Sequence, residues 1–195
     1  MAKRIAIIDA HPDPDAGRLV HALSEAYFQG AKEAGHEVHL IHLAKLDFPL
    51  IHSKEEWDSG KIPEVLEKAQ DSIAWADHLV ILYPLWLGSM PALLKGFLEQ
   101  VLRPGFAIAT PEMGGMSHKL FKGKSARIVV TMGMPAFVYR WYFRAHSLKS
   151  LERNVLKFGG ISPVKETLIG MVEEANAARY ENWLGKLREL GRAGV

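Results

Sequence analysis

The 195-residue sequence contains no cysteine, which excludes disulfide bonds, thiolate nucleophiles and cysteine-ligated metals. It also lacks any apolar run near the ~20 residues that a membrane-spanning helix needs. The basic start at Lys3 and Arg4 leads directly into a short strand pattern, so the apolar core of a secretion signal is missing as well. We therefore expect a cytoplasmic protein with no membrane insertion.

An excess of one charge is also missing. The 24 basic and 22 acidic residues are spread along the chain and leave a net charge of +2, which gives no reason to expect a nucleic-acid partner. Two nucleotide signatures are absent: the glycine fingerprint of a dinucleotide-binding fold, and the phosphate-binding loop that ends in Lys-Ser or Lys-Thr. Several histidines are scattered without the spacing of metal ligands, so we expect no metal site; they include His36, His39, His42 and His52.

Short strand-like runs alternate with segments of helical period along the chain. The expected strands are residues 4–9, 37–43, 78–83, 125–131 and 161–169. Helices are expected over residues 17–34, 63–75, 91–102 and 173–190. A longer helical segment should follow the loop 132–135 and end near residue 158. The connections 48–61 and 103–123 should be irregular. Five alternations with right-handed crossovers predict one α/β domain over residues 1–195, with a parallel sheet covered by helices on both faces.

Such a sheet binds its ligand beyond the carboxyl ends of its strands, where three loops should meet: residues 11–18, 84–91 and 132–139. The second loop is the most informative. Trp86 and Leu87 are apolar where a water-facing connection would be polar, so we expect a flat apolar ligand to cover them. The alternative is that both side chains only pack under a neighbouring loop.

The first loop leads from a buried strand into a helix N-terminus, where free backbone N–H groups favour an anion such as a phosphate. Gly17 permits close approach of the backbone, and Arg18 offers a charge-assisted contact. Asp13 and Asp15 have an alternative, purely structural role as caps of the helix.

Three motifs coincide with these loops. They are His11-Pro12, then Pro84-Leu85-Trp86 continuing to Pro91-Ala92-Leu93-Leu94-Lys95-Gly96-Phe97, and finally Gly105-Phe106-Ala107. Together they resemble the flavodoxin-like NAD(P)H:quinone oxidoreductase family, and the likeness covers most of residues 4–135. The resemblance implies a doubly wound, five-stranded parallel sheet in the order 2-1-3-4-5 and a flavin, FMN or FAD. It also implies NADH or NADPH as the electron donor and a quinone or similar small-molecule acceptor.

Carried over by position, the resemblance implies three groups of flavin-binding residues. The phosphate would lie at His11, Ala16, Gly17, Arg18 and Leu19. The ring and its ribityl chain would lie along Pro84, Leu85, Trp86, Leu87 and Gly88, with Thr131, Met132, Gly133 and Met134 at the ring's other edge. Three departures are visible. Arg18 replaces a usual serine of the first loop, and Met132 and Met134 bring polarizable side chains toward the ring. Ile108 stands where many members have a tyrosine that reaches into a partner subunit's pocket.

The resemblance also implies a tyrosine and a histidine after the third loop that assist proton transfer to the acceptor. Tyr139 has the matching spacing, and His146 lies one position beyond it. Seven residues apart on one expected helix, they would share a face, and histidine transfers protons readily near neutrality. The alternative is that the aromatic-rich segment 137–143 contributes only packing.

The apolar character of residues 103–123 and 137–143 predicts a homodimer with its sites at the interface. Two rival functions come from similar flavodoxin-like proteins. One is a regulatory, ancillary subunit of a potassium-efflux system with little turnover. The other is a flavodoxin-type electron carrier, although such carriers are usually strongly acidic and this chain is slightly basic.

Overall fold

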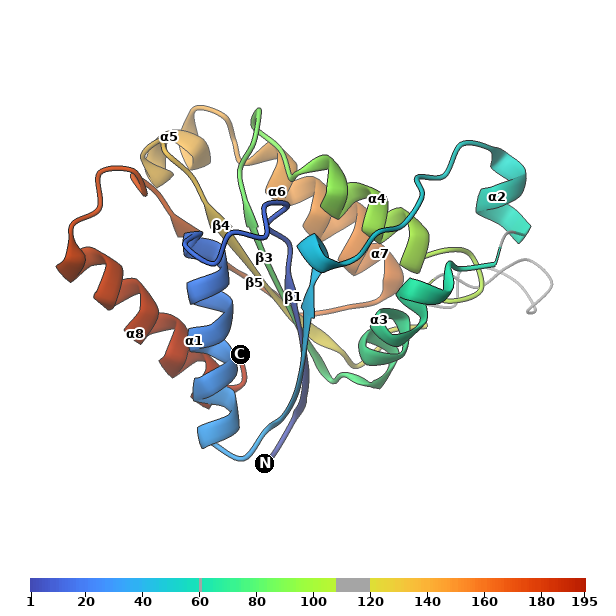
Figure 1. The fold of residues 1–195 in the computed structure, drawn as a ribbon, viewed down its shortest axis with the longest axis horizontal. Coiled ribbons are helices and arrows are strands. Elements are labelled where there is room, and N and C mark those ends of the chain that lie inside the picture. Colours follow the sequence, from blue (N-terminus) through green and yellow to red (C-terminus); the bar gives the residue numbers. More distant parts are fainter. Residues whose placement is uncertain (60, 108–119) are drawn as a thin grey trace.

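The computed structural model describes residues 1–59, 61–107 and 120–195. Its single five-stranded sheet has the order β2-β1-β3-β4-β5. All four neighbouring pairs are parallel, which confirms the predicted fold class and strand order. The strands are β1 (Arg4–Asp9), β2 (Glu37–His42), β3 (His78–Pro84), β4 (Ser125–Thr131) and β5 (Val164–Ile169). Figure 1 shows the sheet between two layers of helices.

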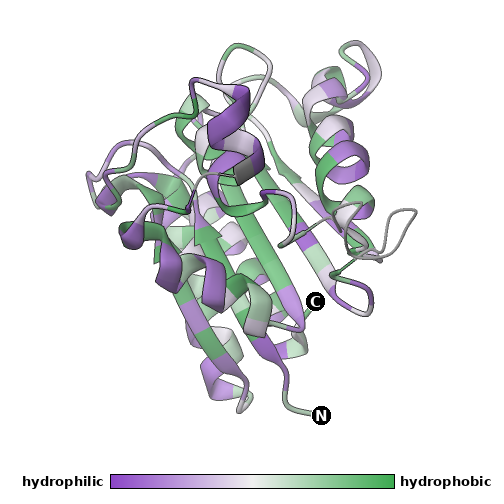
Figure 2. Ribbon diagram, turned by 90° about the vertical axis from the view of Figure 1, so that its right-hand side faces the viewer, coloured by the Kyte–Doolittle hydropathy of each residue, from purple (hydrophilic) through white to green (hydrophobic). Residues whose placement is uncertain are grey.

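The central strands are buried because both of their faces are covered. Every residue of β3 is buried, and so is every residue of β1 after Arg4. One face is covered by α1 (Leu19–Glu33) and α8 (Ala177–Ala193), and the other by α3 (Glu64–Trp75), α4 (Ala92–Val101) and the helices after α5 (Figure 1). Figure 2 shows hydrophobic residues concentrated along the strands, while the covering helices mix both kinds.

Helices α1 and α8 cross at unusually close range through two glycines. A Cβ atom at Gly30 would lie 2.0 Å from the carbonyl oxygen of Arg188, and one at Gly191 would lie 2.1 Å from that of Tyr27. Any side chain at either position would force the two backbones apart. The two helices are therefore in close backbone contact near their C-terminal ends, on this face of the sheet.

The prediction of one continuous helix after the third loop is wrong. The chain instead forms α5 (Ala136–Trp141), α6 (His146–Ser150), the π-helical turn η3 (Leu151–Leu156) and α7 (Lys157–Gly159). Arg144 and Ala145 have φ values of 54° and 48°, a left-handed conformation that reverses the direction of the chain and ends α5. Helical period in the sequence does not reveal such a break, because neither residue is a usual helix breaker.

Smaller differences affect the ends of other elements. The connection at 48–61 contains the short helix α2 (Lys54–Ser59), and β2 ends one residue early in the 3-10 turn η1 (Leu43–Lys45). Strand β5 begins three residues later than expected, and α8 begins at Ala177, where the Asn176 side chain accepts a hydrogen bond from the Arg179 N–H. Most of the predicted connection 103–123 lies outside the described residues. Among the residues described, no helix is long and apolar enough to cross a membrane.

Candidate functional site

The three predicted loops meet at the carboxyl edge of the sheet. The chain leaves β1 toward β2 on one side and returns to β3 on the other, so the strand order reverses between the ends of β1 and β3, the place where sheets of this kind have their ligand crevice. Across this crevice the ring of His11 lies edge-on to that of Trp86, with 5.9 Å between their centroids. The third loop joins them, because the Leu85 N–H donates to the carbonyl oxygen of Thr131 at 2.8 Å.

The second loop is a two-residue hairpin. The N–H groups of Trp86 and Ser89 each donate to the other residue's carbonyl oxygen at 2.9 Å. At the tip, Leu87 and Gly88 have φ values of 48° and 74°, as in a type I′ turn, which strongly prefers Asn-Gly. Leucine in this conformation is strained, and its side chain is fully exposed.

The same hairpin presents unpaired backbone N–H groups and an exposed aromatic side chain. Within the described part of the chain, the N–H groups of Leu87 and Gly88 have no hydrogen-bond partner. Trp86 is 48 % exposed. The alternative that Trp86 and Leu87 merely pack under a neighbouring loop fails for Leu87 and holds only in part for Trp86. Two free donors beside apolar surface suit a flat ligand with acceptor atoms along its edge.

The first loop folds around its own carboxylates. Asp13 accepts a hydrogen bond from the Asp15 N–H at 2.9 Å, and Asp15 accepts one from the Gly17 N–H at 3.0 Å. Arg18 forms an ion pair with Asp13 at 2.6 Å and lies 3.6 Å from Asp15. The Asp15 N–H bond and, less strongly, Arg18 lower the pKa of Asp13. These carboxylates close turns of the loop and do not cap the helix.

Helix α1 begins without a side-chain cap. Arg18 occupies the N-cap position with no capping hydrogen bond, and the first turn has no acidic residue. The N–H groups of Leu19 and Val20 have no partner among the described residues. The helix therefore offers free donors and its positive dipole end to an anion, in the place where the sequence predicted a phosphate.

The third loop presents mainly backbone to the crevice. Met132 is only 3 % exposed, and its side chain belongs to the core beneath the loop. The Met132 N–H donates to the carbonyl oxygen of Ile169 at 2.9 Å and so continues the pairing of β4 with β5 by one residue. Thr131 is buried as well, whereas Gly133 is exposed and Met134 is half-buried.

Tyr139 and His146 do not share a helix face, and that prediction is wrong because the chain breaks between α5 and α6. Tyr139 is 1 % exposed, and its hydroxyl accepts a hydrogen bond from the Leu148 N–H at 3.2 Å. Burial raises the pKa of this tyrosine. His146 is exposed at the first position of α6. The structure therefore separates an internal tyrosine from a solvent-facing histidine.

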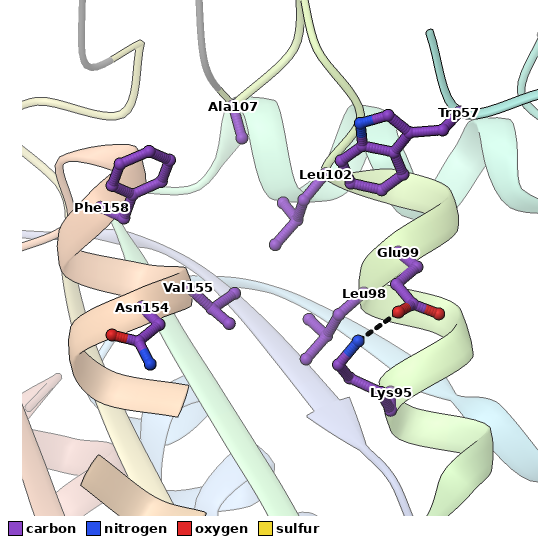
Figure 3. Close-up of a pocket in the computed structure, with 9 residues that line it drawn as sticks. All are labelled: Trp57, Lys95, Leu98, Glu99, Leu102, Ala107, Asn154, Val155 and Phe158. Atoms are coloured by element: carbon purple, nitrogen blue, oxygen red, sulfur yellow. Dashed lines mark hydrogen bonds and ion pairs between the residues drawn. The ribbon is translucent and has the colours of Figure 1, made fainter. Parts of the chain in front are cut away.

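Two cavities flank helix α4. One, of about 520 Å³, lies beside the hairpin and is lined in part by Trp86, Leu87, Ser89 and Ser147. Ser147 connects α6 to the hairpin, since its Oγ lies 3.3 Å from that of Ser89. The other, of about 430 Å³, is shown in Figure 3. Its walls come mostly from α4, η3 and α7, and the Lys95–Glu99 ion pair lies on its rim.

Exposed aromatic side chains surround the third loop. Phe137, Trp141, Tyr142 and Phe143 are all exposed, and Trp141 is 78 % accessible. The rings of Tyr142 and Phe143 contact each other edge to face at 4.9 Å. The alternative that aromatic residues of this segment only pack inside the protein therefore does not hold for these four side chains, whereas Tyr139 is buried. Apolar surface gathered in one place usually meets a ligand or another protein.

Comparison with known proteins agrees with this geometry. A family model described by its flavodoxin-like fold matches residues 3–190. The chain belongs to this family. A Haemophilus influenzae protein named as an uncharacterized NAD(P)H oxidoreductase is 33 % identical over 168 residues, which are 84 % of this chain and 82 % of the relative.

Two further known proteins match nearly the whole chain. An NAD(P)H oxidoreductase of Escherichia coli, also named as uncharacterized, is 27 % identical and covers 97 % of both chains. The solved structure of an NAD(P)H:quinone oxidoreductase from Methanothermobacter marburgensis has a TM-score of 0.81, with 24 % identity and full coverage of both chains. At that identity the structural likeness supports the fold.

Proposed function

We propose that this protein is a flavin-dependent NAD(P)H oxidoreductase that delivers two electrons to a quinone or a similar small acceptor. The observation that carries the proposal is the hairpin at the carboxyl edge, where the free N–H groups of Leu87 and Gly88 lie beside the exposed ring of Trp86. The names of the Haemophilus and Escherichia relatives support the same class of reaction.

The residues present fit a flavin at both ends. The isoalloxazine ring is flat, with apolar faces and acceptor atoms along its edge, which matches the hairpin. The phosphate end matches the uncapped start of α1 with the free N–H groups of Leu19 and Val20. The Arg18 guanidinium would exchange its Asp13 partner for the phosphate, so FMN and FAD, which share this phosphate, are both accommodated.

The bound flavin would supply the two-electron chemistry, and the chain would supply binding and electrostatics. N–H groups of Leu87 and Gly88 would stabilise negative charge that develops at the ring's edge, because they are fixed in place before the reaction. Trp86 would exclude water from one side of the ring. No nucleophile or paired carboxylate is required.

We further propose different roles for Tyr139 and His146. His146 precedes Ser147 at the cavity beside the hairpin and would give or take the acceptor's proton, while Tyr139 would position α6 through its bond to Leu148. Replacing His146 with Gln should slow acceptor reduction by about 100-fold, with flavin affinity unchanged. Stopped-flow absorbance separates the two half-reactions, and an unaltered acceptor step would remove His146 from the mechanism.

We also propose that the protein forms a homodimer in the cytoplasm. Its exposed aromatic residues 137 and 141–143 form a patch of the kind that subunit interfaces cover. Sedimentation equilibrium should give twice the 21.7 kDa chain mass over a range of concentrations. A constant monomer mass would contradict this.

An anaerobic absorbance titration tests the function. Protein reconstituted with FMN, and separately with FAD, receives NADPH or NADH and then a quinone, with free flavin at the same concentration as the control. Bleaching of the bound flavin by one nucleotide and recovery with quinone are expected. Bound flavin that neither nucleotide bleaches would reject the enzyme and favour a regulatory flavoprotein.

A further inference from the structure

A cluster of one carboxylate and two imidazoles lies under the first loop. Asp9, at the end of β1, is completely buried. Its Oδ2 accepts hydrogen bonds from the Nδ1 atoms of His21, in the first turn of α1, at 2.6 Å and of His42, at the end of β2, at 3.0 Å. All three atoms lie within 4.8 Å of one another. This convergence is not visible in the sequence, because the residues are 12 and 21 positions apart.

The outer atoms of this cluster are already held in place. The second oxygen of Asp9 accepts a hydrogen bond from the His11 N–H at 3.4 Å. Nε2 of His21 lies 2.9 Å from the carbonyl oxygen of Asp13, within donating distance when Nδ1 binds an ion. Histidines that bind metals typically donate their other ring N–H to a carbonyl or carboxylate in this way. His42 has 32 % of its side chain exposed, which gives an ion a route to the buried carboxylate.

We propose that Asp9, His21 and His42 form a binding site for a divalent ion of the zinc class. Two imidazole nitrogens and one carboxylate oxygen are a set that Zn²⁺, Co²⁺ and Ni²⁺ prefer, whereas Mg²⁺ and Ca²⁺ prefer oxygen alone. Bonds of about 2.0–2.2 Å to zinc require neighbouring ligand atoms roughly 3.3 Å apart. From their present distances of 2.6 Å and 3.0 Å to Oδ2, Nδ1 of His21 would move away by about 0.7 Å and Nδ1 of His42 by about 0.3 Å as the ion binds. The two Nδ1 atoms, which lie within 4.8 Å of each other, would be drawn together around the ion.

His39, the other histidine of β2, has different partners. It stacks on Trp75 at 4.0 Å, and its Nδ1 lies 3.0 Å from the Ser72 Oγ. The pair His21 and His42 is different, because both aim at one buried oxygen that forms no ion pair with a lysine or arginine among the described residues. A divalent ion would neutralise that carboxylate and tie β1, α1 and β2 together beneath the first loop.

Zinc binding to tag-free, chelator-treated protein tests this site, because an affinity tag would itself bind the ion. Isothermal titration with Zn²⁺ alone should give one ion per chain, and Co²⁺ should develop the visible absorption of a cobalt ion with nitrogen ligands. Zinc should also raise the melting temperature. None of these three measurements needs flavin. Failure to bind zinc would therefore leave the proposed oxidoreductase function standing, and failure of the oxidoreductase test would leave the zinc site standing.

Variants of three histidines test which side chains bind the ion. His42→Gln should weaken zinc binding by about 100-fold and abolish the cobalt absorption, and His21→Gln should do the same. His39→Gln, on the same strand, should bind zinc like the unaltered protein. Melting curves in chelator confirm that each variant is folded. Absence of stoichiometric zinc binding by the unaltered protein, or equal weakening by His39→Gln and His42→Gln, would overturn the site.

Discussion

The two edges of the sheet are built in opposite ways. At the amino edge, side chains join distant segments: Arg4 pairs with Asp77 at 2.6 Å, and Lys3 donates to the carbonyl oxygen of Gly194 at 2.7 Å. At the carboxyl edge, the hairpin holds a strained leucine and two N–H groups without a partner among the described residues. At the amino edge these bonds join segments far apart in the chain, whereas the hairpin at the carboxyl edge leaves backbone donors available to a ligand.

This difference follows from what each edge must do. A pairing completed within the chain contributes to stability but is no longer available to a ligand. Strain and unpaired donors cost stability and persist where a bound molecule can use them. We therefore expect changes at the amino edge to alter unfolding without altering flavin affinity, and changes at the carboxyl edge to do the reverse.

The largest expected effect is at the amino edge and depends on pH. Burial, and then the nearby charges of Lys3 and Arg127, lower the pKa of His78 to about 3. Unfolded histidine titrates near 6.5, so the unfolded chain takes up this proton first as the pH falls. Stability should therefore decrease from pH 6.5 down to about 3, by about 1.4 kcal/mol per pH unit.

Urea unfolding at several pH values between 7 and 4 measures this slope. His78→Gln keeps a polar partner for the Ser125 hydroxyl, which lies 2.8 Å from the histidine Nδ1, but has no proton to take up. The variant should lose less stability on acidification than the unaltered protein. Identical slopes would show that other groups cause the loss.

A pair of tryptophan variants compares the edges directly. Trp86→Ala should weaken flavin binding by roughly 10- to 100-fold, the value of one buried aromatic side chain, and leave the melting temperature of flavin-free protein nearly unchanged. Trp75→Ala, at the amino edge, removes the ring that stacks on His39 and should lower the melting temperature without changing flavin affinity. Flavin fluorescence and thermal melting measure both, and unchanged flavin affinity in Trp86→Ala would show that the ring lies elsewhere.

The sheet and the meeting of the loops were predictable because they depend on local pattern. Apolar runs such as residues 78–83 specify buried strands, and βα alternation limits the topology. The likeness to known oxidoreductases added the expected strand order. What depends on tertiary contact was missed: the left-handed Arg144 and Ala145, and the inward turn of Met132.

The cluster of Asp9, His21 and His42 shows the same limit at the site. Spacing along the chain indicates metal ligands only when they come from one local motif. Here β1, α1 and β2 each contribute one residue, so only the parallel pairing of Asp9 with His42 and the position of α1 reveal the set. The hairpin was more visible, because a Trp-Leu-Gly sequence between two prolines is unusual in a connection.

A smaller effect is expected at the hairpin tip. Leu87→Asn creates the Asn-Gly sequence that a type I′ turn prefers, so flavin-free protein should gain roughly 0.5–1 kcal/mol of stability. Flavin affinity should fall severalfold, because the apolar side chain is lost while the backbone N–H remains. Thermal melting and flavin titration measure the two effects. A variant that gains stability and keeps full affinity would show that the Leu87 side chain has no part in binding.

The smallest effect should come from Glu33, which joins α1 to α8. Arg188, and then Arg192 at 2.8 Å, lower the pKa of this carboxyl to about 2. Because the folded pKa lies below the unfolded one, the contribution is present above pH ~4.5 and disappears as the pH falls toward 2. Glu33→Gln should lower the melting temperature slightly at pH 7, and 1 M NaCl should shrink the difference, since exposed ion pairs are weak and screened by salt. A difference that persists at pH 2 would mean that Glu33 acts through packing rather than charge, and any change in flavin affinity would contradict the separation of the two edges.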